Sequence, residues 1–351
     1  MLIDKRIKAF SELGNFLSQF NRKKIEQRSN VINNELFFDA FNLQIKRAKE
    51  YNGWFTEDNI LFAFESWSNL LNENNLTKWT STYSLENKHP KTIALVMAGN
   101  IPLVGFHDFL SVAISGNKVL AKQSSNDKHF LPLISKYLEY VEPQFKGYFK
   151  FSDDKLTDFD AAIATGSNNT ARYFEYYFGK YPNIIRMNRN SVAVLTGNET
   201  EDELKALGED IFRYFGVGCR RVSKLFVPTD YNFNKIFEAI YNRHEIINFK
   251  KYQNNYDYNK AVYLMSNFNL LENGFLMLKE DASYSSPIAT LFYEYYDNIA
   301  SLQQKLNLDS EHIQCVVGNV IENSVSFGKT QHPTLTDYAD GIDTLEFLSK
   351  L

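Results

Sequence analysis

The sequence has few cysteines: only Cys219 and Cys315 occur among its 351 residues. Two cysteines in a chain of this length do not make a disulfide framework, so a reducing, cytoplasmic compartment is expected. Long hydrophobic runs are also absent, and none approaches the roughly 20 residues that span a bilayer. The opening MLIDKRIKAF lacks the apolar core of a signal peptide. Neither secretion nor membrane insertion is therefore predicted.

Neither sign of charge dominates the chain. The 38 Lys and Arg residues nearly balance the 42 Asp and Glu residues, and the basic residues are scattered. Nucleic acid and anionic membranes are therefore not expected as partners. No metal site is predicted either, because the six histidines are dispersed. The only close pair, His312 and Cys315, lies in a strand-like segment that would point the two side chains to opposite faces.

The glycine-rich fingerprints of nucleotide-binding proteins are missing. The chain has neither a GxGxxG motif nor a Walker loop. The nearest signals are AGNIP at 98–102 and TGS at 165–167, and each follows an apolar run. Such turns need Gly and Ser for backbone reasons alone, so neither one by itself identifies a phosphate site.

Helical and strand-like patterns alternate along the chain. Up to about residue 75 the apolar spacing is helical, as in RIKAFSELGNFLSQF, and Thr56 is a plausible cap for a second helix. From Lys91 onward, TIALVMAGN, KVLAKQSS and FDAAIATGS are typical of buried strands, and helix-length segments at 103–115 and 127–141 separate them. This alternation predicts an α/β fold with a doubly wound sheet, whose ligands bind at the carboxyl ends of the strands.

A second α/β unit begins after Gly197. EDELKALGEDIFRYFG is predicted to form a helix up to Gly216, and SKLFV a strand after it. The polar stretch KYQNNYDYNK, at 251–260, is predicted to be a loose surface loop.

Four of these segments occur in an order that resembles the aldehyde dehydrogenase superfamily. They are the Asn-x-Pro turn of MAGNIP, the strand GNKVLAK, the turn ATGS and the turn GVGC before SKLFV. Within that superfamily the chain is most similar to the bacterial LuxC-type fatty-acid reductases, which reduce acyl-CoA. MAGNIP, RMNRNS, FGVGCRRVSKLFVP and the tail DYADGIDTLEFL carry this likeness.

The resemblance implies an aldehyde-dehydrogenase-like architecture. Residues 1–197, which include the helical N-terminus, would form a Rossmann-type cofactor domain completed by residues 325–351. Residues 198–324 would form an α/β domain that carries the catalytic thiol. The resemblance also implies a homo-oligomer, a dimer or larger.

Under this resemblance Cys219 is the nucleophile, and a thiolate suits the task because it exchanges one thioester for another of similar energy. Arg220 and Arg221 would favour the thiolate, although two arginines at a strand start also fit a solvated surface. Asn100 would donate its side-chain amide to the oxyanion. A turn asparagine without a catalytic role is the alternative for that position.

The resemblance assigns the adenosine end of a nicotinamide cofactor to the strand end KQSS. Lys122 would reach the ribose, with Ser124 and Ser125 beside it. Ser125 stands where members that prefer NAD often carry a glutamate. The absence of that carboxylate removes repulsion against a 2′-phosphate, so NADPH is expected ahead of NADH.

Two further segments would complete the cofactor site. Thr165, Gly166 and Ser167 would open a helix beside the pyrophosphate, where free backbone N–H groups suit an anion. Pro287 matches the segment that holds the nicotinamide ribose, although Ser283 replaces the glutamate of that segment.

One departure from the acid-forming aldehyde dehydrogenases is informative. Arg186 aligns with the glutamate that activates water in those enzymes, so the acyl-enzyme should persist. The predicted function is NADPH-dependent reduction of an acyl-CoA, with a fatty acyl group, to an aldehyde and CoA through a thioester on Cys219. Three alternatives stay open: an acid-forming aldehyde dehydrogenase, a cofactor-free acyltransferase or thioesterase that uses Cys219, and a non-catalytic relative.

Overall fold

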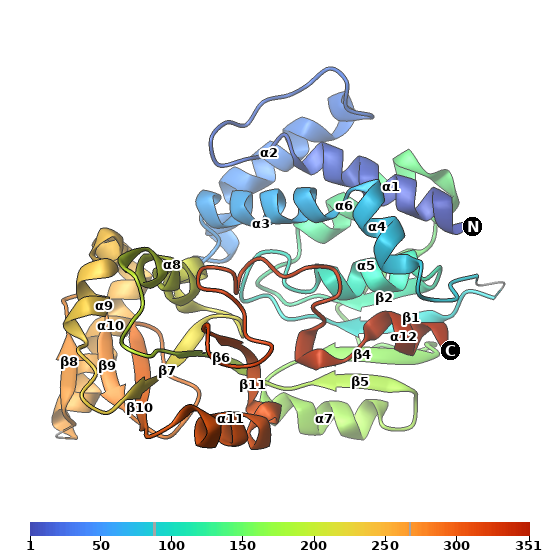
Figure 1. The fold of residues 1–351 in the computed structure, drawn as a ribbon. Helices are drawn as coiled ribbons and strands as arrows, with labels where there is room; N and C mark the ends of the chain where they lie inside the picture. The colour runs from blue at the N-terminus through green and yellow to red at the C-terminus, as the bar shows by residue number, and fades with distance from the viewer. Residues whose placement is uncertain (87–88, 267) are drawn as a thin grey trace. The chain divides into compact units, whose positions relative to one another are not determined.

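The computed structural model describes residues 1–86, 89–266 and 268–351, and the chain divides into two compact units (Figure 1). Unit 1 comprises residues 1–187 and 334–351, and unit 2 comprises residues 188–333. Each unit is built around one largely parallel sheet, which confirms the predicted α/β class.

The sheet of unit 1 has five parallel strands in the order β3-β2-β1-β4-β5. Its strands are β1 (Thr92–Val96), β2 (Lys118–Lys122), β3 (Phe149–Phe151), β4 (Ala161–Thr165) and β5 (Asn183–Arg186). The order reverses between β1 and β4, and the crevice at such a reversal is where open α/β sheets bind ligands. Lys122, Val96 and Ala164 pair in one row, so the turns after β1, β2 and β4 leave the sheet at one edge.

The N-terminal part of unit 1 is helical, as predicted. The helices of the unit are α1 (Ile3–Leu17), α2 (Asn34–Tyr51), α3 (Glu57–Leu70), α4 (Glu73–Thr80), α5 (Phe106–Ile114), α6 (Phe130–Val141), α7 (Asn168–Phe178), α12 (Thr344–Ser349) and the short 3₁₀ turns Pro143–Phe145 and Ala339–Gly341. Thr56 caps α3 as expected, because its side chain accepts the Asn59 N–H at 3.3 Å. Fully buried rings of Phe10, Phe16 and Phe64 help form the core between these helices and the sheet.

The sheet of unit 2 has six strands in the order β11-β6-β7-β10-β9-β8, and only β8 runs antiparallel to its neighbour. Its strands are β6 (Asn190–Val194), β7 (Val222–Pro228), β8 (Leu270–Glu272), β9 (Met277–Glu280), β10 (Thr290–Tyr296) and β11 (Ile313–Val317). Its helices are α8 (Glu201–Phe212), α9 (Asn234–Ala239), α10 (Lys250–Met265), α11 (Ile299–Leu308) and 3₁₀ turns at Arg213–Gly216, Tyr241–Asn248 and Ser310–His312. Because β6 pairs with β7 and β11, residues 190–194 lie in this sheet, whereas the predicted boundary placed them in the first domain.

Two local predictions for unit 2 are wrong. The expected loop at 251–260 lies within α10, because Tyr252, Tyr256 and Asn259 recur at helical spacing and are buried on one face. The Tyr252 hydroxyl donates to the carbonyl of Phe275 at 2.9 Å, so a polar-looking stretch is anchored from its buried side. The helix α8 ends four residues earlier than expected, since the backbone turns left-handed after Arg213.

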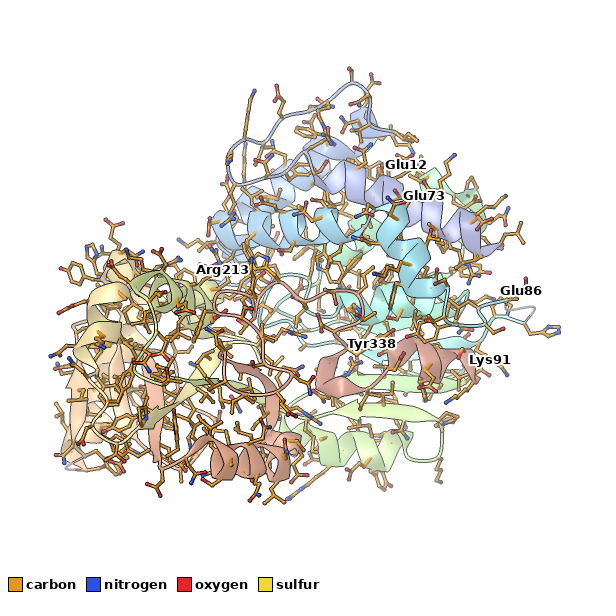
Figure 2. All side chains as sticks on the ribbon, viewed as in Figure 1. Glu12, Glu73, Glu86, Lys91, Arg213 and Tyr338 are labelled. Atoms are coloured by element: carbon orange, nitrogen blue, oxygen red, sulfur yellow. The ribbon has the colours of Figure 1, made fainter. Side chains whose placement is uncertain are left out.

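The C-terminal segment belongs to the core of unit 1. Leu335, Leu345 and Leu348 are buried in the same apolar cluster as the helices of the N-terminus. The hydroxyl of Tyr338 (Figure 2) accepts the Trp79 Nε1–H at 2.8 Å. Residues 334–351 therefore complete unit 1.

A buried ion pair joins three elements of unit 1. The side chain of Arg186, at the end of β5, is 4% exposed and pairs with Asp108 on α5. Its second terminal nitrogen donates to Thr344 Oγ1 on α12 at 2.9 Å. Arg186 is thus held inside unit 1 by partners that are far away in the sequence.

Asp108→Asn should destabilise the protein strongly, because the substitution leaves the Arg186 cation buried without its counter-charge. Breaking one side of a buried pair typically costs about 3 to 5 kcal/mol of unfolding free energy. Urea unfolding followed by circular dichroism measures the loss. Glu346→Gln is the matched control, since the Glu346–Lys350 pair on α12 is exposed and should matter little. Similar unfolding midpoints for the two variants would contradict the role assigned to the buried pair.

Candidate active site

Cys219 lies at the end of a turn with an unusual backbone. Tyr214, Phe215 and Gly216 have φ values of 55°, 59° and 71°, and Gly218 has a φ of 102°. Non-glycine residues in this left-handed region are strained, and such strain persists only where packing supports it. The Phe215 ring supplies part of that support, since it stacks on Phe249 with ring centroids 4.2 Å apart. The turn leaves Cys219 exposed just before β7.

A buried serine supports the backbone of Cys219 through a hydrogen bond. Ser191, on β6, is fully buried and its hydroxyl donates to the Cys219 carbonyl at 3.0 Å. The same Oγ lies 3.0 Å from the Sγ of Cys315 on β11. Neither residue is among the predicted site residues: Cys315 enters the sequence patterns only as the neighbour of His312, and Ser191 ends the motif RMNRNS that carried the family likeness.

The two cysteines have different environments, and neither forms a disulfide. Burial raises the pKa of the Cys315 thiol, while the hydrogen bond with Ser191 and the nearby Arg220 lower it. Desolvation is the largest of these effects, so Cys315 favours the neutral thiol. Cys219 is exposed, whereas Cys315 is half-buried.

The two arginines after Cys219 do different things. Arg221 is buried, and its Nη2 donates to the carbonyl of Ser286 and, at 3.3 Å, to Ser286 Oγ. Burial lowers the pKa of Arg221 to about 10. This guanidinium therefore ties the segment that carries Cys219 to the loop that carries Pro287, whose carbonyl accepts the Thr290 N–H at 3.2 Å. The predicted stabilisation of a Cys219 thiolate by positive charge therefore depends on Arg220, which is partly exposed.

In unit 1 the predicted residues gather at the carboxyl edge of the sheet. Asn100 is exposed in the loop after β1, and no hydrogen bond to its side chain is found within residues 1–86, 89–266 and 268–351. Lys122 ends β2, and its Nζ donates to the Asp154 carbonyl at 3.2 Å. Ser124 lies against Gly99, where an added Cβ would come within 2.6 Å of the serine Cβ. Ser125 beside it is exposed.

The TGS segment forms a strand–turn–helix at the same edge. Thr165 ends β4, and the Gly166 N–H donates to the carbonyl of Arg186 at 3.3 Å. Ser167 caps α7 by accepting the Thr170 N–H at 3.3 Å. A side chain at Gly166 would approach the Phe174 ring to 2.8 Å, so the turn has to stay bare. The result is a tight turn into a helix N-terminus, which suits an anion such as a pyrophosphate.

These observations fit a nicotinamide dinucleotide at the carboxyl edge of unit 1. The bare turns at Gly99 and Gly166, the exposed Ser125 and the N-terminus of α7 lie at the ends of β1, β2 and β4 around the strand-order reversal. Among the predicted site residues, unit 1 contains Asn100, Lys122, Ser124, Ser125, Thr165, Gly166 and Ser167, and unit 2 contains Cys219 and Pro287.

The described residues contain neither a metal-binding cluster nor a membrane-spanning helix. Within the part of the chain that the structure describes, no group of three or more His, Cys, Asp or Glu side chains could hold a metal ion. No helix of the described residues has the length and apolar character that a membrane crossing needs.

Several solved structures that this chain resembles are aldehyde dehydrogenases. Aldehyde dehydrogenase 21 from Physcomitrella patens, in complex with the reaction product succinate, matches with a TM-score of 0.66 at 12% identity over 100% of this chain and 84% of that one. The NAD+ complex of a Bacillus cereus aldehyde dehydrogenase matches with a TM-score of 0.58 at 12% identity over 92% and 72%. A Mycobacterium tuberculosis aldehyde dehydrogenase with NAD+ matches with a TM-score of 0.58 at 12% identity over 87% and 70%. At these identities the likeness establishes the fold.

The family comes from the sequence itself. No curated protein matches the chain. The acyl-CoA reductase (LuxC) family matches residues 15–242, which is more than half of the chain and includes the segments around Asn100, Lys122 and Cys219. With the aldehyde dehydrogenase fold, this match makes the chain an oxidoreductase of acyl or aldehyde groups that belongs to the acyl-CoA reductase (LuxC) family.

Proposed function

We propose that this protein uses NADPH to reduce a fatty acyl-CoA to an aldehyde and free CoA, through a thioester on Cys219. The observation that carries the proposal is the exposed Cys219 on a strained turn braced by Ser191, in a member of the acyl-CoA reductase family. A thiol held this way meets the requirement for covalent catalysis, which is a fixed and accessible nucleophile.

In the first step the Cys219 thiolate attacks the carbonyl carbon of the acyl-CoA. A carbon–sulfur bond forms, the carbonyl oxygen becomes an oxyanion, and collapse expels the CoA thiolate. The Asn100 side-chain amide and the Cys219 backbone N–H would donate hydrogen bonds to that oxyanion. Loss of one such donor typically slows a reaction by about a hundredfold to a thousandfold.

The acyl-enzyme then has to resist water. The resemblance aligns Arg186 with the water-activating glutamate of acid-forming relatives, and the Arg186 side chain is buried against Asp108 and Thr344. A buried guanidinium cannot accept a proton from water, because it has no lone pair to offer. This arrangement supports survival of the thioester until reduction.

Unit 1 offers the groups that would hold the cofactor. Lys122 and Ser125 would bind the adenosine ribose and its 2′-phosphate, and the N-terminus of α7 would bind the pyrophosphate. Solved neighbours that contain NAD+ support a nicotinamide cofactor. When bound, NADPH supplies the hydride that brings the acyl group to the aldehyde level. Cys219 finally leaves as a thiolate and the aldehyde is released.

Native alkylation should distinguish the two cysteines. Iodoacetamide at pH 8 should modify Cys219 quickly and Cys315 slowly, because burial raises the pKa of Cys315 and the thiolate is the reactive form. Peptide mass spectrometry measures the labelling of each cysteine. The denatured protein is the control and should label at both sites. Equal native rates would contradict the assignment of Cys219 as the reactive thiol.

Cys219→Ala should abolish both acyl-enzyme formation and acyl-CoA-dependent oxidation of NADPH, with retained NADPH binding as the control. The unmodified protein should oxidise one NADPH for each aldehyde formed, which absorbance and chromatography measure together. Steady carboxylate formation from aldehyde without CoA would instead indicate an acid-forming enzyme. Acyl transfer without oxidation of NADPH would indicate an acyltransferase or thioesterase. Wild-type turnover in the alanine variant would refute the proposal.

Ser125→Glu should shift the cofactor preference toward NADH, because the new carboxylate repels a 2′-phosphate. The ratio of kcat/KM for NADPH over NADH should fall by about tenfold or more, the change that about 1.4 kcal/mol of repulsion produces. Ser84→Glu, at an exposed position of unit 1, adds the same charge elsewhere and should leave the ratio unchanged. An unchanged ratio in Ser125→Glu would remove Ser125 from the cofactor site.

A further inference from the structure

Polar side chains form hydrogen bonds with the backbone of the Asn100 loop on both sides of Asn100. These side chains are not among the predicted site residues. The residue before Asn100 is Gly99, and its carbonyl accepts the Asn52 Nδ2–H at 3.2 Å. Three residues after Asn100, the Leu103 N–H donates to Asp127 Oδ2 at 3.2 Å. The exposed side chain of Asn100 therefore projects from a loop whose backbone is fixed on either side.

Asn52 is itself held in one orientation. It lies at the end of α2, is 6% exposed, and its side-chain oxygen accepts the Trp54 N–H at 3.0 Å. Because the oxygen is used in this way, the side-chain nitrogen has to point at the Gly99 carbonyl. A buried amide with both ends bonded is a rigid support.

The second contact supports strained backbone. Leu103 has a φ of 58°, in the left-handed region that leucine rarely adopts, and its side chain is buried. Such a conformation persists only where the surroundings determine it. The hydrogen bond from its N–H to Asp127 is one of those determinants, and the buried leucine side chain is another.

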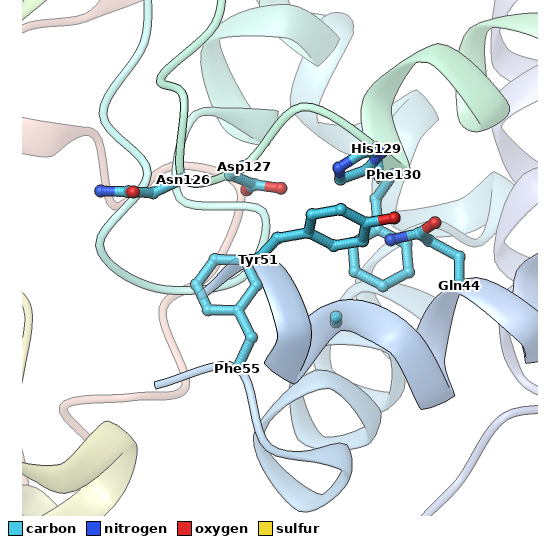
Figure 3. Close-up of a pocket in the computed structure, with 8 residues that line it drawn as sticks. Gln44, Tyr51, Phe55, Asn126, Asp127, His129 and Phe130 are labelled. Carbon is cyan, nitrogen blue, oxygen red and sulfur yellow. The ribbon is translucent and has the colours of Figure 1, made fainter. Parts of the chain in front are cut away.

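Asp127 lies in the loop between β2 and α6, at the edge of a small hollow (Figure 3). Tyr51 and His129 line the hollow, and the centroids of their rings lie 4.1 Å apart. Burial raises the pKa of Asp127 to about 7, while the hydrogen bond from Leu103 lowers it. The neutral acid still presents a carbonyl oxygen, so the contact with Leu103 survives in either protonation state.

We infer that Asn52 and Asp127 are positioning residues that hold the Asn100 amide where the oxyanion forms. This inference rests on the proposed function. Oxyanion donors act by being in place before the charge develops, so their supports matter as much as the donors themselves. A displacement of about 1 Å in a catalytic group can cost about a hundredfold in rate.

The test measures acylation of Cys219 without any cofactor. The protein is mixed with an acyl-CoA, quenched at intervals with acid, and its acylated fraction is read by intact-protein mass spectrometry. Asn52→Ala and Asp127→Ala should each slow acylation by about tenfold to a hundredfold, with little change in the acyl-CoA concentration that gives half the maximal rate. Asp127→Asn keeps an acceptor oxygen and should restore most of the rate.

A double-mutant cycle separates positioning from a merely structural role. In an Asn100→Ala background the donor is gone, so adding Asn52→Ala or Asp127→Ala should slow acylation by less than about twofold. Asn74→Ala, an exposed asparagine on α4, is the matched control and should have no effect in either background. Circular dichroism checks that each variant folds. If Asn52→Ala does not fold, the comparison of Asp127→Ala in the unmodified and Asn100→Ala backgrounds still tests the positioning role.

Each outcome bears on a different claim. Rate losses in the Asn100→Ala background as large as those in the unmodified protein overturn the inference and leave the proposed function standing. Unimpaired acylation in Asn52→Ala and Asp127→Ala does the same. Unimpaired acylation in Asn100→Ala, or no acylation of the unmodified protein, overturns the proposed chemistry and the inference with it.

Discussion

The Arg186 guanidinium is buried in unit 1, and a buried cation is tolerated only with a counter-charge and further acceptors. Asp108 and Thr344 supply them, so the requirement joins β5 to α5 and to the C-terminal helix. The Arg186 backbone carbonyl also accepts the Gly166 N–H of the TGS turn. The α5 helix that carries Asp108 begins directly after the Asn100 loop. Arg186 therefore connects two of the turns on which the proposed site depends, one through its backbone carbonyl and one through the ion pair of its side chain with Asp108.

Left-handed non-glycine residues accompany three of the proposed functional segments. They are Leu103 after Asn100, Tyr214 and Phe215 before Cys219, and Ala289 after Pro287. Each costs roughly 1 to 3 kcal/mol where it is not compensated. Packing and hydrogen bonding offset that cost in the turns of this chain: Phe215 stacks on Phe249, and Asp127 receives the Leu103 N–H. A turn of this kind exposes a side chain while its backbone stays fixed in position. A nucleophile and an oxyanion donor both need such a fixed position.

Local patterns predicted the parts of this protein in which neighbouring residues decide the structure. The strands β1, β2 and β4, the cap at Thr56 and the TGS turn fall where apolar runs, caps and glycines placed them. The prediction failed where distant partners decide. A polar stretch became α10 because Tyr252 reaches the carbonyl of Phe275, and β6 joined the second sheet through its pairing with β7 and β11. Family motifs led to the predicted roles of Asn100 and Cys219, which stay predictions, yet no motif pointed to Asn52, Asp127 or Cys315, whose proposed roles arise only from contacts across the fold.

The two cysteines lie in different environments, which suits them to different roles. The exposed Cys219 is the proposed nucleophile, and Cys315 contacts the serine that supports it. Cys219 is exposed on a turn, whereas Cys315 is largely desolvated and its pKa is raised, so it stays a neutral thiol. A neutral thiol beside Ser191 Oγ adds no negative charge beneath the proposed nucleophile, and a second thiolate there would oppose ionisation of Cys219. The Ser191 hydroxyl can then donate its hydrogen bond to the Cys219 carbonyl. Because Cys315 favours the neutral thiol, the Ser191 hydroxyl stays available to the Cys219 carbonyl, and the half-buried sulfur adds no negative charge near the exposed one.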